Sequence, residues 1–486
     1  MILREAFDYE FSRLDPTGDH IDPPSVAVYE TVLAKGPDWN AHPVLAEAWE
    51  TTPDGLEWRV RLRPGLRFHS GAPCDARAVL ESLEHLRWMF PGQQLWYWDP
   101  VDTVEALDAL TLRFRLHHPY SRLPALLWGT HTAVYNERLR AERPEDFGYT
   151  VADGTGPFRL VSWSPERIVA ERWPEYAAAP APFLEAGAGR VERIEWVAIL
   201  DETERLAALE DGRVDCLHGP PLGEVGRLHA DPRFEVIEQP QASNMYLALD
   251  WRRSDLGFDD LQMRRAISLA VDRRALVDRA LDGHGSSAWG PVPPGDEFYD
   301  PSIDAEGRHD PEQARAVLAG RDLRFECVVQ DDPAFRRVAA LVVEQLEAVG
   351  VRIEPRFVRP FAPFYGAVAD GPPASISKWL WQDPVDALIG FSATHARPFP
   401  NWQHASAPAL DDAYRRWLRA DSHDELAAAA ALVQRVFADE LPYVPLLVPN
   451  DVWVHSRRVH GWRPFQANLY PFYHGTVVSR DPAPGA

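Results

Sequence analysis

The sequence has almost no lysine. Lys35 and Lys378 are the only two among 486 residues, so arginine supplies nearly all of the 50 basic residues. Asp and Glu together number 73, which gives a formal net charge of −23 at pH 7. Such an acidic surface repels phosphate backbones, and the composition therefore argues against nucleic-acid binding. We draw no function from the preference for arginine over lysine.

Cysteine is also scarce. Cys74, Cys216 and Cys327 lie far apart, and the sequence contains no C-x-x-C. An odd number of cysteines cannot pair completely within one chain. We therefore predict that the three are small buried side chains.

Long apolar runs are missing. The longest, LAAAAALV at 426–433, is too short to span a bilayer and is followed by Gln434 and Arg435. The N-terminus shows no basic, apolar leader, and Met1 directly precedes the strand-like ILREAF. Two explanations stay open: a signal peptide has been removed, or the protein remains in the cytoplasm.

Motifs of catalysis are absent as well. GHGSSAWG at 283–290 does not place its serines as a G-x-S-x-G elbow does, and H-E-x-x-H does not occur. His117 and His118 follow a strand pattern, in which successive side chains point to opposite faces, so joint metal binding is awkward. Acid pairs such as Asp331-Asp332 resemble turn and cap residues. We expect no enzymatic activity, no metal and no cofactor.

The first clear elements form a small α+β unit. Trp58, Val60 and Leu62 alternate with charged residues, the period of a half-buried strand, with turn residues on both sides. Asp75 suits an N-cap, and apolar residues follow it at helical spacing. The pattern at 101–116 predicts a hairpin.

The rest of the chain alternates strands and helices. RIEWVAIL, ETERLAALEDG and VDCLHG, between 193 and 219, predict strand, helix and strand, which favours an α/β layer. Asp310 and Asp332 each suit an N-cap and precede a proline at the first helical position, while Gly320 and Gly350 suit the helix ends. Further predicted elements are a strand at 351–358, a helix at about 423–438 and a short apolar strand in LPYVPLLV.

Taken together, these motifs resemble the family 5 extracellular solute-binding proteins, which include the dipeptide-, oligopeptide- and nickel-binding proteins of ABC importers. The likeness spans residues 45–447. Six stretches carry it in order: LAEAWETTPDGLEWRVRLRPGLRFHSGAP, GTGPFRL, DDLQMRRAISLAVDRRALV, HDPEQARAVLA, LVVEQLEAVGVRIE and ELPYVPLLV.

The resemblance implies an α/β, two-lobed periplasmic-binding-protein fold of type II, of the large cluster C type, with an extra small α+β domain. Lobe I would comprise 1–42, 155–243 and 448–486, the extra domain 43–154, and lobe II 244–447. It also implies a monomer whose lobes close around a buried solute and deliver it to ABC permease subunits. The protein would be periplasmic, or a membrane-tethered extracellular lipoprotein, if a leader was removed, and cytoplasmic if Met1 is the native start.

The segment SKWLWQDPVD carries the sharpest site prediction. In peptide-binding relatives an aspartate three residues before the acid-proline pair holds the free α-amine of the peptide. Here Asp383 begins that pair, and the position is Leu380, between Trp379 and Trp381. A buried ammonium without a counter-charge is costly, so this position is poorly suited to bind a free α-amine. Lys378 instead suggests tolerance for an anionic or electron-rich group, unless it points to solvent.

Aromatic and amide side chains supply the other candidates for ligand contact. Each tryptophan has core packing as its alternative, because large aromatics bury much area wherever they lie. Stacking rings with polar neighbours suit an oligosaccharide, an apolar natural product, or a peptide with a blocked N-terminus. The candidates, besides the segment around Lys378, are Tyr29, Trp96, Trp98, Trp128, Asn244, Tyr246 and Trp402.

Two functions follow. The first is a non-enzymatic receptor that captures a peptide-like or oligosaccharide-like solute in an interlobe cleft for an ABC importer. The second, which the missing leader suggests, is a cytoplasmic ligand sensor, or a carrier or catalyst of a biosynthetic pathway, that reuses the same fold.

Overall fold

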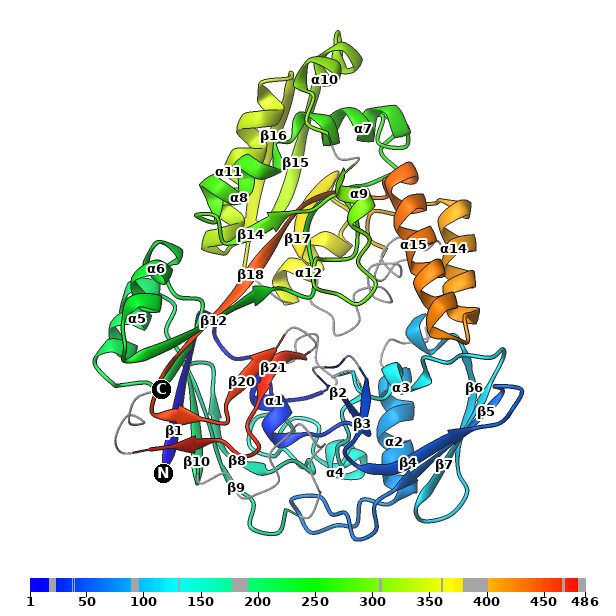
Figure 1. Cartoon of the computed structure of the whole chain (residues 1–486), viewed down its shortest axis with the longest axis vertical. Coiled ribbons are helices and arrows are strands. Elements are labelled where there is room, and N and C mark those ends of the chain that lie inside the picture. The colour runs from blue at the N-terminus through cyan, green and yellow to red at the C-terminus, as the bar shows by residue number, and fades with distance from the viewer. Residues whose placement is uncertain are drawn as a thin grey trace. The chain divides into compact units, whose positions relative to one another are not determined.

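The chain divides into two compact units, seen here in a computed structural model (Figure 1). Unit 1 comprises Met1–Gln239 and Asp451–Ala486, and unit 2 comprises Pro240–Asn450. The three-part division implied by the resemblance stays a prediction. The structure describes residues 1–16, 23–36, 38, 40–88, 96–129, 132–176, 191–305, 308–359, 362–378, 401–465 and 468–479.

Three neighbouring strands of the unit 1 sheet are parallel. β1 (Ile2–Phe7) lies between β10 (Arg193–Ala198) and β11 (Cys216–His218) and pairs with both. Helix α5 (Glu202–Glu210) connects β10 to β11, which confirms the strand, helix and strand predicted at 193–219. Antiparallel strands flank them: β9 (Arg167–Arg172) and β8 (Phe158–Ser164) beyond β10, and the C-terminal part of β18 (Val444–Ser456) beside β11.

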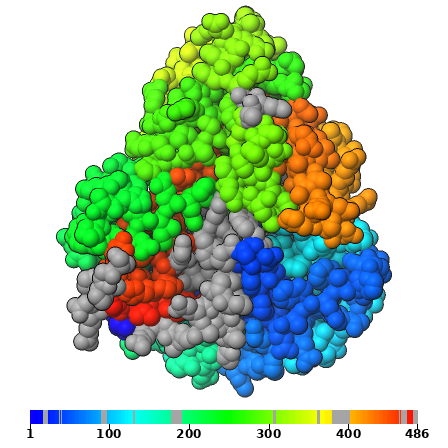
Figure 2. All heavy atoms as spheres, in the orientation of Figure 1, coloured from blue at the N-terminus to red at the C-terminus, as the bar shows by residue number. Residues whose placement is uncertain are grey.

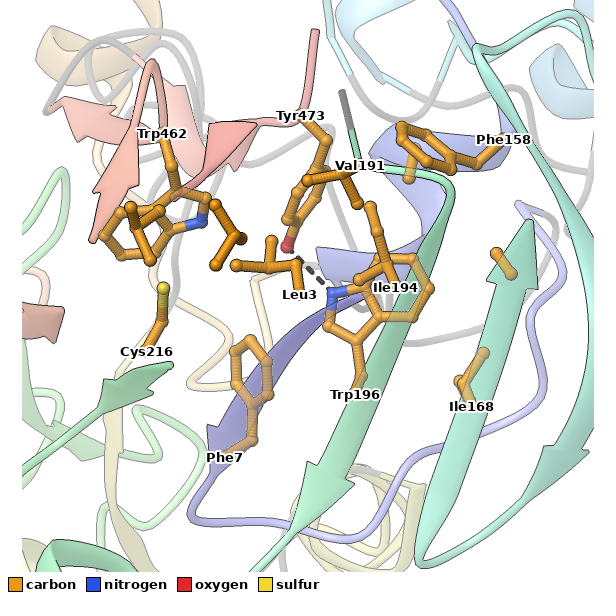
Figure 3. Close-up of a cluster of buried hydrophobic side chains, with 14 of the residues drawn as sticks. Leu3, Phe7, Phe158, Ile168, Val191, Ile194, Trp196, Cys216, Trp462 and Tyr473 are labelled. Carbon is orange, nitrogen blue, oxygen red and sulfur yellow. Dashed lines mark hydrogen bonds between the residues drawn. The ribbon is translucent and has the colours of Figure 1, made fainter. Parts of the chain in front are cut away.

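The unit 1 core lies on one face of this sheet (Figure 3). Successive β1 side chains alternate between faces, so Leu3 and Phe7 enter this core while Ala6 packs on the α5 side. The indole of Trp196 donates a hydrogen bond of 2.9 Å to the Tyr473 hydroxyl, drawn in Figure 3. The C-terminal segment therefore completes a core that the first strand begins.

The segment from 43 to 154 contains an antiparallel sheet ordered β4-β5-β7-β6. The structure confirms the strand around Trp58 and the hairpin at 101–116, and Asp75 accepts a hydrogen bond from Ala78 N as the predicted N-cap. β5 pairs with β4 on one side and with β7 on the other. The elements are β4 (Ala46–Thr51), β5 (Glu57–Leu62), β6 (Val101–Ala106), β7 (Thr111–Leu116) and α2 (Ala76–Arg87).

Unit 1 contains further short elements. They are α1 (Pro23–Val28), β2 (Leu33–Lys35), β3 (Ala41–Pro43), η1 (Trp96–Trp98), α3 (Leu123–Leu126), α4 (Glu137–Glu142), η3 (Leu222–Glu224), α6 (Val225–Ala230), β12 (Phe234–Pro240), β19 (Val459–His460), β20 (Arg463–Phe465), β21 (Asn468–Phe472) and β22 (Val477–Val478).

The unit 2 sheet repeats the parallel arrangement. β15 (Leu323–Gln330) lies between β16 (Val351–Val358) and β17 (Ala374–Lys378) and is parallel to both. β13 (Met245–Leu249) pairs antiparallel with β17 and with the first half of β18, and β14 (Gly285–Ser287) also pairs with β18. The strand predicted at 351–358 is confirmed, and LPYVPLLV leads into a longer strand than expected.

Two helices cover opposite faces of this sheet (Figure 1). On one face, Val328 of β15 packs against Phe364 and Val368 of α12 (Ala362–Ala369). On the other face, the guanidinium of Arg336, in α11 (Pro333–Glu347), lies 4.2 Å from the ring centroid of Phe357 in β16. We call these the α12 face and the α11 face.

The remaining helices of unit 2 begin and end as the caps predict. Asp310 and Asp332 accept hydrogen bonds from the first turns of α10 and α11, and Gly320 and Gly350 adopt positive φ just beyond the helix ends. In Figure 2, α14 and α15 (orange) form part of the unit 2 surface. The other helices are α7 (Leu261–Ala270), α8 (Arg273–Ala280), α9 (Pro301–Ala305), α10 (Pro311–Leu318), α14 (Pro408–Arg419) and α15 (His423–Glu440).

Two arginines of DDLQMRRAISLAVDRRALV are buried in unit 2. Arg264 donates to the carbonyls of Glu440 and Leu441, which lie at the end of α15. Arg273 donates to the carbonyl of Pro445 in β18. Burial lowers the pKa of Arg264 to about 10 and that of Arg273 to about 9. Because their donors bind backbone carbonyls, Arg264 ties α7 to the end of α15 and Arg273 ties α8 to β18, rather than facing a ligand.

Within the described ranges, no helix combines the length and the apolar character needed to cross a bilayer.

Candidate functional site

Both units share one topological feature. Of three parallel strands, the first in sequence lies between the second and the third: β1 between β10 and β11, and β15 between β16 and β17. In such sheets the connections that follow the first strand lead to opposite sides of it. Ligands bind at this point, just beyond the carboxyl ends of the strands. These ends carry Asp8 and His218 in unit 1, and Gln330 and Lys378 in unit 2. We call them the unit 1 and unit 2 switch points.

The unit 1 switch point is a cluster of charges. His218 Nε2 lies 2.7 Å from Asp451 Oδ1, and His218 Nδ1 lies 3.3 Å from Asp8 Oδ1. Burial opposes a charge on His218, but the two carboxylates outweigh it and raise its pKa to about 10. The imidazole is therefore protonated at neutral pH and links three segments: the ends of β1 and β11 and the middle of β18.

A buried arginine lies next to this cluster. Arg205 of α5 donates to the carbonyls of Ile199, His218 and Gly219, just past the ends of β10 and β11. Burial opposes ionisation of Asp8, but the hydrogen bond and charge of His218, with the charge of Arg205, hold its pKa well below the ordinary value. Among the described residues of the unit 1 switch point, two cations thus balance two carboxylates.

The described side chains on the α12 face of the unit 2 switch point are uncharged. Tyr246 of β13 pairs with Ser377 of β17, and continuing the register from Val329–Ile376 places Gln330 beside Ser377. Paired residues of neighbouring strands share a face, and Gln330 lies two positions after Val328 on the α12 face. Gln330, Ser377 and Tyr246 therefore form one polar row across three strands, which we call the polar row.

Further polar groups extend the polar row. The Ser375 and Ser377 hydroxyl oxygens lie 3.2 Å apart. The Tyr246 ring centroid lies 4.5 Å from that of Tyr443, and the Asn244 amide donates 2.8 Å to the carbonyl of Gly290. Burial raises the pKa of Tyr246 and of Tyr443. Both phenols are therefore neutral hydrogen-bonding groups.

A pair of aromatic rings lies beside the polar row. Tyr365 of α12 and Trp402 are stacked, with centroids 5.6 Å apart and planes inclined by 26°. The charge of Tyr365 would raise the pKa of Tyr246 further. Both stacked rings are half-buried.

Lys378 lies on the opposite face of the sheet. It follows Ser377 directly, and its ammonium is 5.9 Å from the ring centroid of Phe335 at the start of α11. Alternation along β17 therefore separates it from the polar row. The structure thus brings together Asn244, Tyr246 and Trp402 among the predicted contact residues and places Lys378 apart from them.

The predicted residues of unit 1 lie in packed surroundings. Tyr29 donates its hydroxyl to the carbonyl of Leu14 at 3.0 Å, and Trp98 is fully buried. Trp128 is also buried, with the Lys35 ammonium 5.4 Å from its ring centroid. As ligand contacts these residues stay predictions. Trp379, Trp381 and Asp383, and the side chain of Trp96, lie outside the described residues.

Reasoning from the sequence missed several residues of the switch points. Gln330 and Asp8 each stand at the end of an apolar strand pattern, and polar residues there are the available signal. Their partners Ser377 and His218 could be recognised only once the strand order was known. Metal binding was not expected, and the part of the chain that the structure describes holds no group of three His, Cys, Asp or Glu suited to a metal ion.

The comparison with protein families identifies the class. The family described as "Bacterial extracellular solute-binding proteins, family 5 Middle" matches residues 40–396. The chain therefore belongs to the family 5 solute-binding proteins, which bind peptides and related solutes for ABC importers. The resemblance drawn from the six motifs is confirmed.

Individual relatives are more distant. The chain is 25% identical over 488 residues to the glutathione-binding protein GsiB of Salmonella paratyphi A, covering 94% of this chain and 91% of the relative. It is 26% identical over 360 residues to GsiB of Pectobacterium atrosepticum, covering 71% of this chain and 66% of the relative. Neither identity is high enough to carry over a ligand.

The solved structures agree on the fold. The periplasmic binding protein DppA of Helicobacter pylori, in complex with the peptide STSA, superposes with a TM-score of 0.84 at 20% identity. The match covers 99% of this chain and 98% of that one. The predicted α/β periplasmic-binding-protein fold is therefore confirmed.

Proposed function

We propose that this protein is the solute receptor of an ABC importer and binds a peptide-like or oligosaccharide-like solute at the switch points. The family match over residues 40–396 is the observation that carries this proposal. The names of relatives support the solute class, since one is glutathione-binding and another was solved with a four-residue peptide. The protein acts as a monomer, passes its solute to permease subunits and catalyses no reaction.

The family is described as extracellular, which supports an exported protein. A genomic reading frame that continues upstream into a leader with a lipobox cysteine would support a tethered lipoprotein. A native start at Met1 would instead favour a cytoplasmic sensor or pathway protein with the same fold.

A thermal-shift screen tests solute binding. The probes are glutathione and dipeptides, neutral di- and trisaccharides, and Ni²⁺–histidine chelates. A solute at a hundredfold excess over its Kd stabilises the folded state by about 2.7 kcal/mol, so a saturable rise of melting temperature is expected with one class. A flat response across all three classes would contradict the proposal.

A further inference from the structure

The side chains gathered at the polar row share one property: none is an acid or a base. Hydroxyl groups and carboxamides make up the whole set. Its described members are Asn244, Tyr246, Gln330, Ser375, Ser377 and Tyr443.

Two atoms of this set are buried without a partner. Asn244 Oδ1 and the Tyr443 hydroxyl are buried and have no hydrogen-bond partner among the described residues. Gln330 lies in the same set and is 8% exposed. A buried polar group without a hydrogen-bond partner is unfavourable, so this face favours a molecule that completes these bonds.

The described charged residues next to the polar row point to the other face of the sheet or interact with other residues. Lys378 points to the α11 face. Asp331 pairs with Arg336 at 2.5 Å, and Asp332 accepts hydrogen bonds from the first turn of α11. An ammonium or carboxylate placed on the polar row would therefore lose its water without gaining a counter-charge from the described residues, which is strongly unfavourable.

The stacked rings complete the chemistry. Tyr365 and Trp402 offer half-buried aromatic faces beside Tyr246, and such faces pack against the C–H surfaces of a saccharide ring or a peptide. Small-molecule sites commonly combine such an apolar wall with a few hydrogen-bonding groups.

We infer that the α12 face of the unit 2 switch point binds an uncharged part of the solute, one rich in hydroxyl or amide groups, with the Gln330 amide as a direct hydrogen-bonding contact. This inference rests on the proposed function. A saccharide ring and the blocked main chain of a peptide both offer this chemistry.

The test uses the full-length protein with substitutions at Gln330. Gln330→Met keeps the size and removes the hydrogen bonds, while Gln330→Glu keeps the shape and adds a charge. Gln262→Met on exposed α7 is the matched control. The probes are neutral di- and trisaccharides, N-acetylated tripeptide amides, and the same tripeptides with free ends, each titrated by calorimetry.

For the probes that bind, Gln330→Met should weaken affinity about tenfold or more, which corresponds to the loss of one or two hydrogen bonds of a buried group. Gln330→Glu should not improve it, and the control should match the wild type. Binding of saccharides or of blocked peptides identifies which of the two molecules supplies the uncharged part.

Two results would overturn the inference. One is a Gln330→Glu protein that binds free-amine peptides more tightly than the wild type, which would mean that an ammonium lies here. The other is a bound probe whose affinity neither Gln330→Met nor Trp402→Leu changes; the second variant serves if the first lowers the melting temperature of the free protein. Failure of every probe on the wild type would instead count against the proposed function.

Discussion

A carboxyl group lies at the centre of the unit 1 core. Glu5 of β1 is fully buried and accepts a hydrogen bond of 2.7 Å from the Tyr473 hydroxyl, which in turn accepts one from Trp196. Burial raises the pKa of Glu5 to about 8, although the bond from Tyr473 and the charge of His218 oppose the shift. Glu5 is therefore mostly protonated at neutral pH, and one of its oxygens has no partner among the described residues.

Glu5 makes stability depend on pH. Because its pKa is raised from 4.5 to about 8, the folded state holds a proton that the unfolded state has released between these values. The resulting stabilisation is complete below pH 4.5 and is lost as pH rises to 8, with a slope of up to ~1.4 kcal/mol per pH unit. Glu5→Gln should remove this slope, as urea unfolding between pH 5 and 9 would show.

The exposed Glu142→Gln provides the control for this experiment, since it makes the same chemical change at the surface. It should leave the wild-type pH profile unaltered. Parallel profiles for Glu5→Gln and the wild type would show that Glu5 is not the group responsible.

Among the elements, α11 offers a direct measure of capping. The Asp332 side chain accepts hydrogen bonds of 2.8 Å from Ala334 N and 3.3 Å from Phe335 N. Asp332→Ala should lower the free energy of unfolding by about 1 kcal/mol, the usual cost of losing an N-cap. Chemical denaturation measures this. The neighbouring Asp331→Ala removes an exposed ion pair and should change stability by less than about 0.5 kcal/mol; equal losses for both would exclude a capping role.

Elements with their own local signals could be predicted from the sequence. Asp75, Asp310 and Asp332 each combine a capping side chain with an apolar helical stripe, and all three helices begin there. β4 was missed because apolar and polar residues do not alternate cleanly in AEAWET. Most of its side chains are exposed, and the segment is a strand because it pairs with β5. Tertiary context decides such a segment.

The candidate site was harder to predict, because it depends on which strands are neighbours. Asn244, Tyr246 and Trp402 were selected from the sequence, and the structure places them on or near the α12 face. Gln330 was missed because nothing local reveals that β15 and β17 are adjacent and parallel. Lys378 was selected because lysine is rare in this sequence. Neighbouring side chains of a strand point to opposite faces, and composition does not reveal which face a residue occupies.

For the whole molecule, the cysteines report on global unfolding. Cys74 and Cys216 belong to unit 1 and Cys327 to unit 2, and all three are buried and unpaired as predicted. Burial raises the pKa of each thiol, which disfavours the reactive thiolate. We expect a chromogenic disulfide reagent to modify none of them in the native protein and three in guanidinium. Dithiothreitol should leave the melting temperature unchanged; a reducible transition would contradict this.

Unit 2 is one uninterrupted stretch, whereas unit 1 is assembled from both parts of the chain that flank it. Trp453, Trp462 and Tyr473 from the returning segment fill the core around Leu3 and Phe7. On a ribosome that adds ~5–20 residues per second, roughly 10–50 s separate the synthesis of Gln239 from that of Tyr473. All of unit 2 is synthesised within that interval, and throughout it the apolar face of β1 lacks the side chains that cover it in the folded protein. A nascent chain halted before Tyr473 should therefore recruit chaperones through its earliest residues.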